Sequence, residues 1–149
     1  KLKISGGGRC NITNAEFDEH VLLKNYGKAE QFLYSPFSQF GVKETFSFFE
    51  SLGLPLVVQA RQRAFPQTEK AVDVVYALER YMKKGGVTIK TGTGVSKILA
   101  TKGKIEGVEA DGAQYACKAL ILATGGLSHP ETGSTGEGFN WLRELGHSV

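Results

Sequence analysis

The spacing of apolar residues predicts a helical organisation between Ala15 and Leu54. One run of aromatic and aliphatic residues contains Phe32, Leu33, Phe37 and Phe40, and a second contains Val42, Phe46, Phe49 and Leu52. Apolar residues that recur every three or four positions are typical of amphipathic helices with one buried face. We therefore expect these aromatic side chains to pack in the core, in preference to forming a wall beside a flat ligand.

The pattern after Leu54 predicts a short strand or hairpin and then a helix. Residues 56–65 are expected to form this strand or hairpin, with Arg61, Gln62 and Arg63 near its turn. Thr68 is the expected N-cap of the helix that follows. Its apolar face is formed by Ala71, Val74, Val75, Leu78 and Met82. The pairs Lys83-Lys84 and Gly85-Gly86 predict its end, because cations and then glycine favour a helix C-terminus.

The remaining pattern has the period of strands until the last helix. A strand is predicted at residues 87–90, and a three-stranded antiparallel meander at residues 95–100, 105–110 and 114–117. Asp111-Gly112 is a typical two-residue hairpin turn. The apolar residues 119–123 fit a fully buried strand of a parallel sheet. A final helix is predicted through Phe139, Leu142 and Leu145. The fold class is therefore α/β with an antiparallel insert.

Composition narrows the class of protein. The chain has 149 residues, of which 41% are hydrophobic and 22% charged, as in a globular domain with a core. The net charge of +3 is dispersed, so we expect no nucleic-acid partner. No apolar run approaches the roughly 18 residues that span a bilayer, so no membrane partner is expected. Cys10 and Cys117 form no CxxC pair, which favours a reducing, cytoplasmic location.

Candidate chemistry gathers in two glycine-rich segments. In residues 5–14, three consecutive glycines can adopt positive φ and bring backbone amides against a ligand. Arg9, Asn11 and Thr13 follow, with groups that bind phosphate or hydroxyl oxygens. The second segment contains Thr124-Gly125-Gly126 and the glycines of residues 133–138. Loops that lead into helices bind ligands in α/β folds, and helix N-termini favour phosphate.

These segments alone leave nucleotide binding and simple turn geometry both open. Neither matches GxxxxGK[ST], and no complete GxGxxG strand-turn-helix is present. The three histidines have no metal-ligand spacing, and no nucleophile triad or carboxylate pair can be identified. The catalytic residues therefore remain unassigned and no metal is expected. Such an absence agrees with a cofactor that supplies the electron chemistry itself.

Three blocks carry a resemblance to a known family. Lys3–Asn14 reads KISGGGRCNITN, Phe65–Val75 contains FP and KAVDVV, and Leu120–His147 contains LILATGGLSHPETGSTGEG. In this order they resemble FAD-dependent, NAD(P)-linked flavoproteins of the BaiN/RdsA type, which include aminoacetone oxidases. The resemblance implies a partial Rossmann-like FAD-binding domain of the two-dinucleotide-binding-domain type. It also implies that residues 1–149 lack a leading GxGxxG strand-turn-helix and a following substrate or lid domain.

The resemblance also implies a set of FAD-binding residues. Gly6, Gly7, Gly8, Arg9, Cys10 and Asn11 would follow the pyrophosphate and ribityl part of FAD, and Thr13 and Asn14 would complete that turn. Val95 would meet the adenine, and Thr124, Gly125 and Gly126 would pass close to the cofactor. Gly133, Ser134, Thr135 and Gly136 would approach the flavin ring. NAD(P)H is a further expected cofactor.

The function expected from the resemblance is hydride transfer between the flavin and either NAD(P)H or a small-molecule organic substrate. The alternative is a non-catalytic nucleotide-binding or scaffold module. For this segment alone we expect no turnover and weak or absent FAD binding. An exposed edge of the parallel sheet would favour self-association.

Several single residues have two open interpretations. Cys10 is expected to be a packed thiol, since a redox relay needs a resolving cysteine and none is near in sequence. For Arg9, ligand contact and bracing of the loop are equally open. His129 is expected to brace its loop or lie at the surface, and Arg61 and Arg63 to belong to a solvated hairpin.

Overall fold

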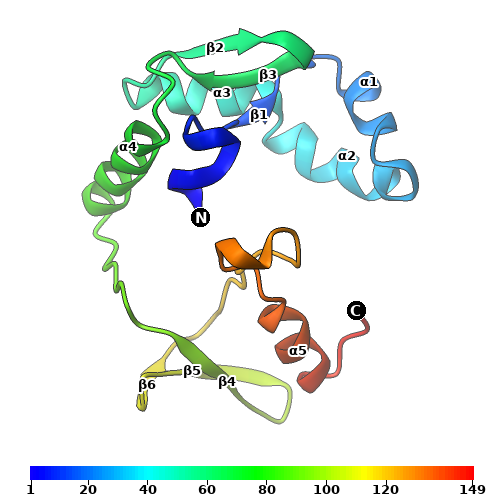
Figure 1. Ribbon diagram of the computed structural model, residues 1–149. Coiled ribbons are helices and arrows are strands. Elements are labelled where there is room, and N and C mark those ends of the chain that lie inside the picture. Colours follow the sequence, from blue (N-terminus) through cyan, green and yellow to red (C-terminus); the bar gives the residue numbers. More distant parts are fainter. The chain divides into compact units, whose positions relative to one another are not determined.

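The computed structural model describes all residues, 1–149, and divides them into two compact units. Unit 1 is Lys1–Thr88 and unit 2 is Ile89–Val149. Unit 1 runs from blue to green in Figure 1. Its elements are η1 (Leu2–Gly8), β1 (Thr13–Asn14), α1 (Glu19–Lys24), η2 (Gly27–Ala29), α2 (Glu30–Gln39), α3 (Val42–Ser51), β2 (Leu56–Gln59), η3 (Ala60–Gln62), β3 (Arg63–Pro66) and α4 (Ala71–Lys84).

The sheet of unit 1 is antiparallel, with the strand order β1-β3-β2. The predicted hairpin is confirmed, since β2 and β3 pair with Val57 opposite Phe65 and Gln59 opposite Arg63. Arg61 and Gln62 form the turn with left-handed backbones, at φ 63° and 54°. Directly opposite residues lie on the same face of a sheet. The register therefore places Gln59, Arg63 and Phe65 on one face of the hairpin.

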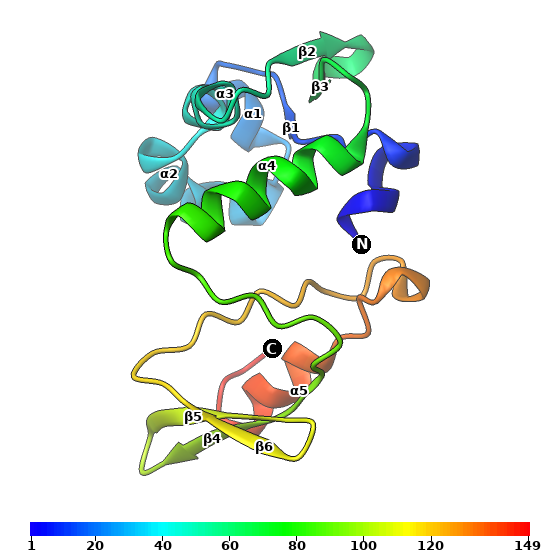
Figure 2. The same cartoon turned by 90° about the vertical axis from the view of Figure 1, so that its left-hand side faces the viewer.

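The core of unit 1 lies between α4 and the end of the glycine segment. Cys10, Leu54, Ala71, Val74 and Ala77 form one buried cluster. Ile12, Phe49, Leu52 and Leu78 pack around it. Figures 1 and 2 both show η1 beside α4, in agreement with the contacts between these two elements. The predicted apolar face of α4 therefore holds the glycine segment in place.

The boundaries of α4 differ from the prediction at one end. The helix begins at Ala71 and its N-cap is Lys70, so the expected cap at Thr68 is wrong. The backbone of Glu69 is left-handed, with a φ of 53°, so a right-handed helix cannot pass through this residue and must begin after it. The C-terminal end is confirmed, because Lys84 is the last helical residue and Gly86 adopts a φ of 74°.

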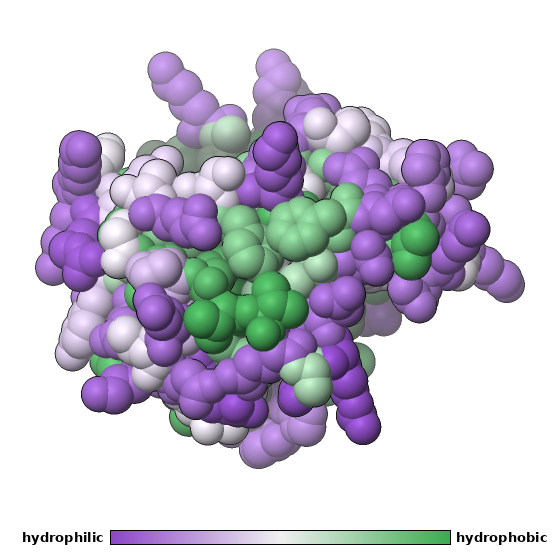
Figure 3. Space-filling view, turned by 90° about the horizontal axis from the view of Figure 1, so that it is seen from above, coloured by the Kyte–Doolittle hydropathy of each residue, from purple (hydrophilic) through white to green (hydrophobic).

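The helices between residues 15 and 54 form as predicted, but part of their aromatic face is exposed. Val42 is buried and Phe49 packs against the core. By contrast, Phe32 is 78% exposed and Phe40 is 55% exposed, so core packing is wrong for these two rings. No residue of α2 is buried. The face seen in Figure 3 shows apolar side chains gathered within a hydrophilic border.

Unit 2 contains the predicted antiparallel meander. Its elements are β4 (Val95–Thr101), β5 (Lys104–Ala110), β6 (Ala113–Ala116), η4 (Pro130–Thr132) and α5 (Glu137–Glu144). The strand order is β4-β5-β6. Both hairpin turns have two left-handed residues, Lys102 with Gly103 and Asp111 with Gly112. This geometry matches the right-handed twist of the flanking strands. The final helix is confirmed as α5.

Two predicted strands are wrong. Residues 87–90 and 119–123 are irregular, and Ile121 is 90% exposed instead of buried. A strand needs a neighbour that takes up its backbone hydrogen bonds, and neither segment has one. The parallel sheet on which the expected self-association rested is therefore absent, and self-association itself stays a prediction. None of the helices combines the length and the apolar character needed to cross a membrane.

Candidate functional site

The three glycines near the N-terminus form a left-handed stretch with an open outer side. Gly6, Gly7 and Gly8 have φ values of 56°, 66° and 82°. The backbone amide of Cys10 donates to the carbonyl oxygen of Ser5 at 3.1 Å and so closes the loop. A Cβ at Gly7 or Gly8 would meet no atom within 4 Å. These two residues therefore need glycine for backbone conformation, and they leave room for a ligand to approach the main chain.

Gly6 is constrained on its inner side as well. A Cβ there would lie 2.8 Å from the backbone nitrogen of Asn11 and 3.4 Å from Cε1 of Phe65. The loop is thus pressed against β3 through Gly6, while its other two glycines face outward. Its position relative to Phe65 depends on the absence of a side chain at this residue.

Cys10 anchors the loop in the core of unit 1. It is 3% exposed, with a left-handed backbone at φ 61°. Burial raises the pKa of the thiol, and a hydrogen bond with Ser5 offsets part of this effect. A buried thiol with a raised pKa is a poor nucleophile. The structure therefore confirms the interpretation of Cys10 as a packed thiol.

The residues after Cys10 bind the loop to β3. The backbone amide of Ile12 donates to the carbonyl oxygen of Ala64 at 2.8 Å. The side-chain amide of Asn11, with its nitrogen toward Ala64 and Thr13, donates to their carbonyl oxygens at 3.3 and 3.1 Å. Oδ1 of Asn14 accepts a hydrogen bond from the backbone amide of Glu16 at 2.8 Å. Asn11 and Asn14 thus use side-chain groups within the protein, which reduces what they can offer to a ligand.

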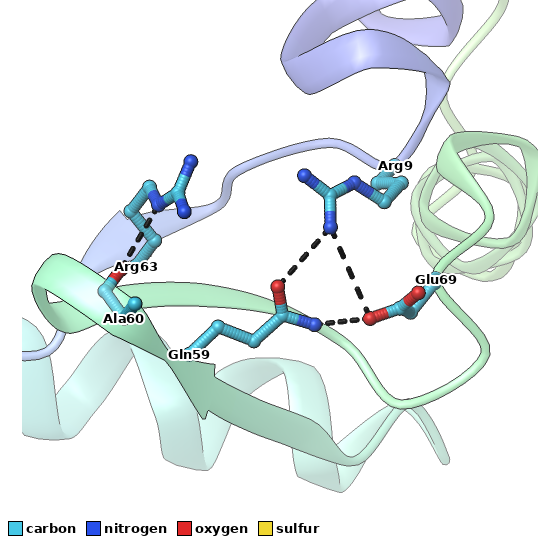
Figure 4. A network of polar contacts seen from close by, with 5 residues as sticks. All are labelled: Arg9, Gln59, Ala60, Arg63 and Glu69. Carbon is cyan, nitrogen blue, oxygen red and sulfur yellow. Dashed lines mark hydrogen bonds and ion pairs between the residues drawn. The ribbon is translucent and has the colours of Figure 1, made fainter.

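Arg9 lies over the hairpin and is held there by three neighbours, of which Gln59 and Glu69 are drawn in Figure 4. Its Nη1 donates to Oε1 of Gln59 at 3.1 Å and lies 4.0 Å from Oε1 of Glu69. Its Cζ lies 4.5 Å from the centroid of the Phe65 ring, a cation–π distance. Nε2 of Gln59 in turn donates to Oε1 of Glu69. The structure therefore shows the bracing role, and both polar contacts of Arg9 use the same nitrogen.

Arg63 lies near the same aromatic ring. Its Cζ is 5.8 Å from the Phe65 centroid, and its Nε donates to the carbonyl oxygen of Ala60 at 3.0 Å. Figure 4 shows both guanidinium groups above the hairpin, with Glu69 on the side of Arg9. Two guanidinium groups and one carboxylate leave a net positive charge here. Arg61 is exposed and Arg63 is half-buried with its hydrogen bond at the surface, in agreement with the solvated hairpin expected for these two residues.

The residues of this loop fit a phosphate-bearing cofactor such as FAD. Gly7 and Gly8 leave space beside the main chain, where a side chain would otherwise stand. Arg9 keeps its Nε and Nη2 donors outside the contacts with Gln59 and Glu69. A guanidinium edge with two parallel donors matches a phosphate group. The arrangement can therefore bind and orient an anionic group, while the electron chemistry would come from the cofactor.

The second glycine-rich segment packs on itself within unit 2. Gly125 has a φ of 78°, and a Cβ there would lie 3.3 Å from Oγ of Ser134, which is 1% exposed. A Cβ at Gly136 would lie 2.6 Å from Cδ2 of Leu127. The structure thus brings Thr124–Gly126 together with residues 133–136. Internal packing explains part of the glycine requirement, and contact with a flavin stays a prediction.

Two other candidate residues are Val95, which precedes the second segment, and His129, which lies within it. Val95 begins β4 opposite Ala110, and its predicted contact with adenine stays a prediction. Nδ1 of His129 lies 2.9 Å from Oε1 of Glu131, so the expected loop-bracing role is confirmed. No group of three or more His, Cys, Asp or Glu side chains is arranged to hold a metal ion.

Gln59 and Glu69 were missed by the sequence interpretation. The signal available for Gln59 was its place in the hairpin, opposite Arg63. Glu69 had no signal of its own, because a left-handed glutamate before a helix follows no sequence pattern. Only the folded loop brings its carboxylate to Arg9.

The sequence profile of one protein family, described as HI0933-like protein Rossmann domain, matches residues 1–149. The chain belongs to this family. The match confirms the Rossmann-like α/β class and the resemblance on which it rested. Rossmann domains bind dinucleotides. One relative of the chain is named as a reductase, in agreement with an oxidoreductase family of flavoproteins.

Three curated relatives align over the whole chain. The 3-dehydro-bile acid delta(4,6)-reductase of Clostridium scindens is 33% identical. The ribosomal RNA dihydrouridine synthases of Haemophilus influenzae and Escherichia coli are 30% and 26% identical. The chain covers 35%, 37% and 36% of these three proteins, respectively. It therefore spans about a third of the length of the relatives that it matches.

Proposed function

We propose that this chain provides part of the FAD site of a flavin-dependent oxidoreductase. In this proposal the loop Gly6–Asn14 binds the phosphate-bearing part of FAD. The observation that carries it is the run of three left-handed glycines, open at Gly7 and Gly8, directly before Arg9. A scaffold loop would need the glycines for its turn, but it would not need a guanidinium with an unused pair of donors beside them.

The proposed reaction is hydride transfer between the flavin and either NAD(P)H or a small organic substrate. Relatives that are named as a reductase and as dihydrouridine synthases support a reaction in which hydrogen is transferred. Within this chain, Arg9 and the glycine amides would hold the cofactor in position, and the cofactor supplies the redox step when bound. Thr124–Gly126 and residues 133–136 remain proposed cofactor contacts from the resemblance alone.

The test is FAD binding by the complete protein that contains these residues. We expect quenching of flavin fluorescence at a ratio of one FAD per chain, and reduction of the bound flavin by NADH or NADPH. Arg9→Met should weaken FAD binding about tenfold, as expected for the loss of one charge-assisted contact. Lys43→Met is a matched control, since Lys43 is an exposed cation on α3. A protein that stays colourless after refolding with excess FAD would contradict the proposal.

The non-catalytic alternative is separated by the same experiment. A protein that binds FAD or another nucleotide, but whose bound flavin no nicotinamide or organic donor reduces, would be a binding module. If the Arg9 and Lys43 variants bound FAD with equal affinity, the loop would not be part of the FAD site. Only the family membership would then support the proposed function.

A further inference from the structure

We propose that Glu69 is a positioning residue for Arg9, which it orients through the side-chain amide of Gln59. The proposal rests on the proposed function, because it takes an FAD phosphate as the ligand of Arg9. The carboxylate would not touch the cofactor. Its role would be to decide which end of the Gln59 amide faces the guanidinium group, and thereby which edge of that group faces the ligand.

The argument starts from the chemistry of the three side chains. A carboxylate can only accept hydrogen bonds, so Glu69 requires the NH₂ end of the Gln59 amide to face it. The carbonyl oxygen of that amide must then point the other way, where it accepts Nη1 of Arg9 at 3.1 Å. With the amide reversed, its NH₂ group would face the guanidinium group, and two donors would oppose each other. Glu69 thus fixes the one orientation that holds Arg9.

The backbone of Glu69 gives an independent indication. Its φ of 53° is in the left-handed region, which is unfavourable for a residue with a side chain. The amide of Glu69 donates to the carbonyl oxygen of Pro66 at 2.8 Å, which closes the turn before α4. Glycine or asparagine would satisfy this turn with less strain. A glutamate at this position indicates that its carboxylate has a role toward the hairpin.

The geometry also determines what remains free on Arg9. The Phe65 ring lies 4.5 Å from Cζ, and Gln59 and Glu69 both contact Nη1. These contacts leave the edge formed by Nε and Nη2, whose two parallel donors suit one phosphate group. If Gln59 released Nη1, the guanidinium could rotate and the binding edge would no longer be fixed. Positioning of this kind reduces the entropy lost on binding.

The proposal and simple electrostatics predict opposite changes in FAD affinity when the charge of Glu69 is removed. Glu69→Gln removes a negative charge that lies 4.0 Å from Arg9. Without a positioning role, this loss would strengthen binding of an anionic cofactor, because one repulsive charge is gone. With the positioning role, Glu69→Gln should weaken FAD binding about threefold, since a glutamine accepts either orientation of Gln59. The direction of the change therefore distinguishes the two explanations.

The experiment measures the dissociation constant of FAD by fluorescence quenching in the complete protein. Glu69→Gln should weaken binding about threefold, and Gln59→Met, which leaves no acceptor for Nη1, about tenfold. The double variant Gln59→Glu, Glu69→Gln should restore wild-type affinity, because a carboxylate at 59 accepts Arg9 in either orientation. Glu50→Gln is the matched control with the same change of charge on α3, and it should leave the affinity unchanged.

A cycle with Arg9→Met tests whether the effect passes through Arg9. In that background Glu69→Gln should change FAD affinity by less than about 1.5-fold, since coupled residues are not additive. Tighter binding or unchanged binding in the Glu69→Gln single variant would overturn the inference, as would a threefold loss that persists without Arg9. The proposed function fails separately, if the wild-type protein itself binds no FAD.

Discussion

A comparison of Gly6→Ala with Gly7→Ala tests how the glycine loop is built. Both residues have left-handed backbones, with φ values of 56° and 66°, so alanine costs roughly 1–2 kcal/mol at either position. At Gly7 nothing lies within 4 Å of the added Cβ, and this conformational cost is the whole effect. At Gly6 the Cβ would meet the backbone nitrogen of Asn11 at 2.8 Å, a contact that requires the main chain to move.

Overpacking of this kind costs typically about 2 kcal/mol. We therefore expect Gly6→Ala to destabilise unit 1 by about 3 kcal/mol, and Gly7→Ala by about 1 kcal/mol. Asn11 cannot move freely, because the neighbouring amide of Ile12 is bonded to Ala64 at 2.8 Å. The difference of about 2 kcal/mol between the two variants isolates the steric term from the conformational one.

The assay is urea denaturation followed by circular dichroism, whose helical signal comes mainly from unit 1, since α1 to α4 lie there and only α5 lies in unit 2. Trp141 is the single tryptophan of the chain and lies in unit 2, so its fluorescence serves as an internal control. The circular dichroism midpoint should fall more for Gly6→Ala than for Gly7→Ala, while the fluorescence transition changes less. Equal destabilisation by the two substitutions would refute the inferred close approach of the loop to Asn11.

Three further predictions concern the core, the meander and the aromatic helices. Burial raises the pKa of the Cys10 thiol above its usual 9.0, so the thiol ionises at a lower pH in the unfolded chain than in the folded one. The free energy of unfolding should therefore fall as pH rises above about 9. In Cys10→Ala the urea midpoint should change less between about pH 8 and 10 than in the wild type. Gly107→Ala should destabilise the meander by about 3 kcal/mol, since its Cβ would overlap the backbone of β6, whereas Gly94→Ala meets nothing and should be near neutral in the same thermal melt. Desolvation and the hydrogen bond to Glu30 raise the pKa of Tyr34 above 10.0, so Glu30→Gln should lower it in an ultraviolet absorbance titration; an unchanged titration would contradict this contact.

Local patterns predicted the elements that depend on near neighbours in the chain. The end of α4 and the turns at residues 101–104 and 110–113 follow from residue type, because Gly86, Gly103 and Gly112 each adopt a positive φ that favours glycine. The meander and the hairpin at residues 56–66 follow from alternation and turn signals. The strand at residues 119–123 failed because an apolar run has no conformation of its own without a partner strand.

The site divides in the same way. The sequence by itself determined that Gly6–Gly8 can adopt left-handed backbones and that Arg9 carries a group able to bind phosphate, because both properties follow from residue type alone. It also determined the family, through the order of its three blocks. Only the tertiary structure decided that Cys10 is buried and that Gln59 and Glu69 hold Arg9 above Phe65. Gln59 and Glu69 are 50 and 60 positions from Arg9 in the sequence, and Glu69 lies in a strained turn. Their side chains come within reach of Arg9 only when the chain folds and brings the hairpin against the loop.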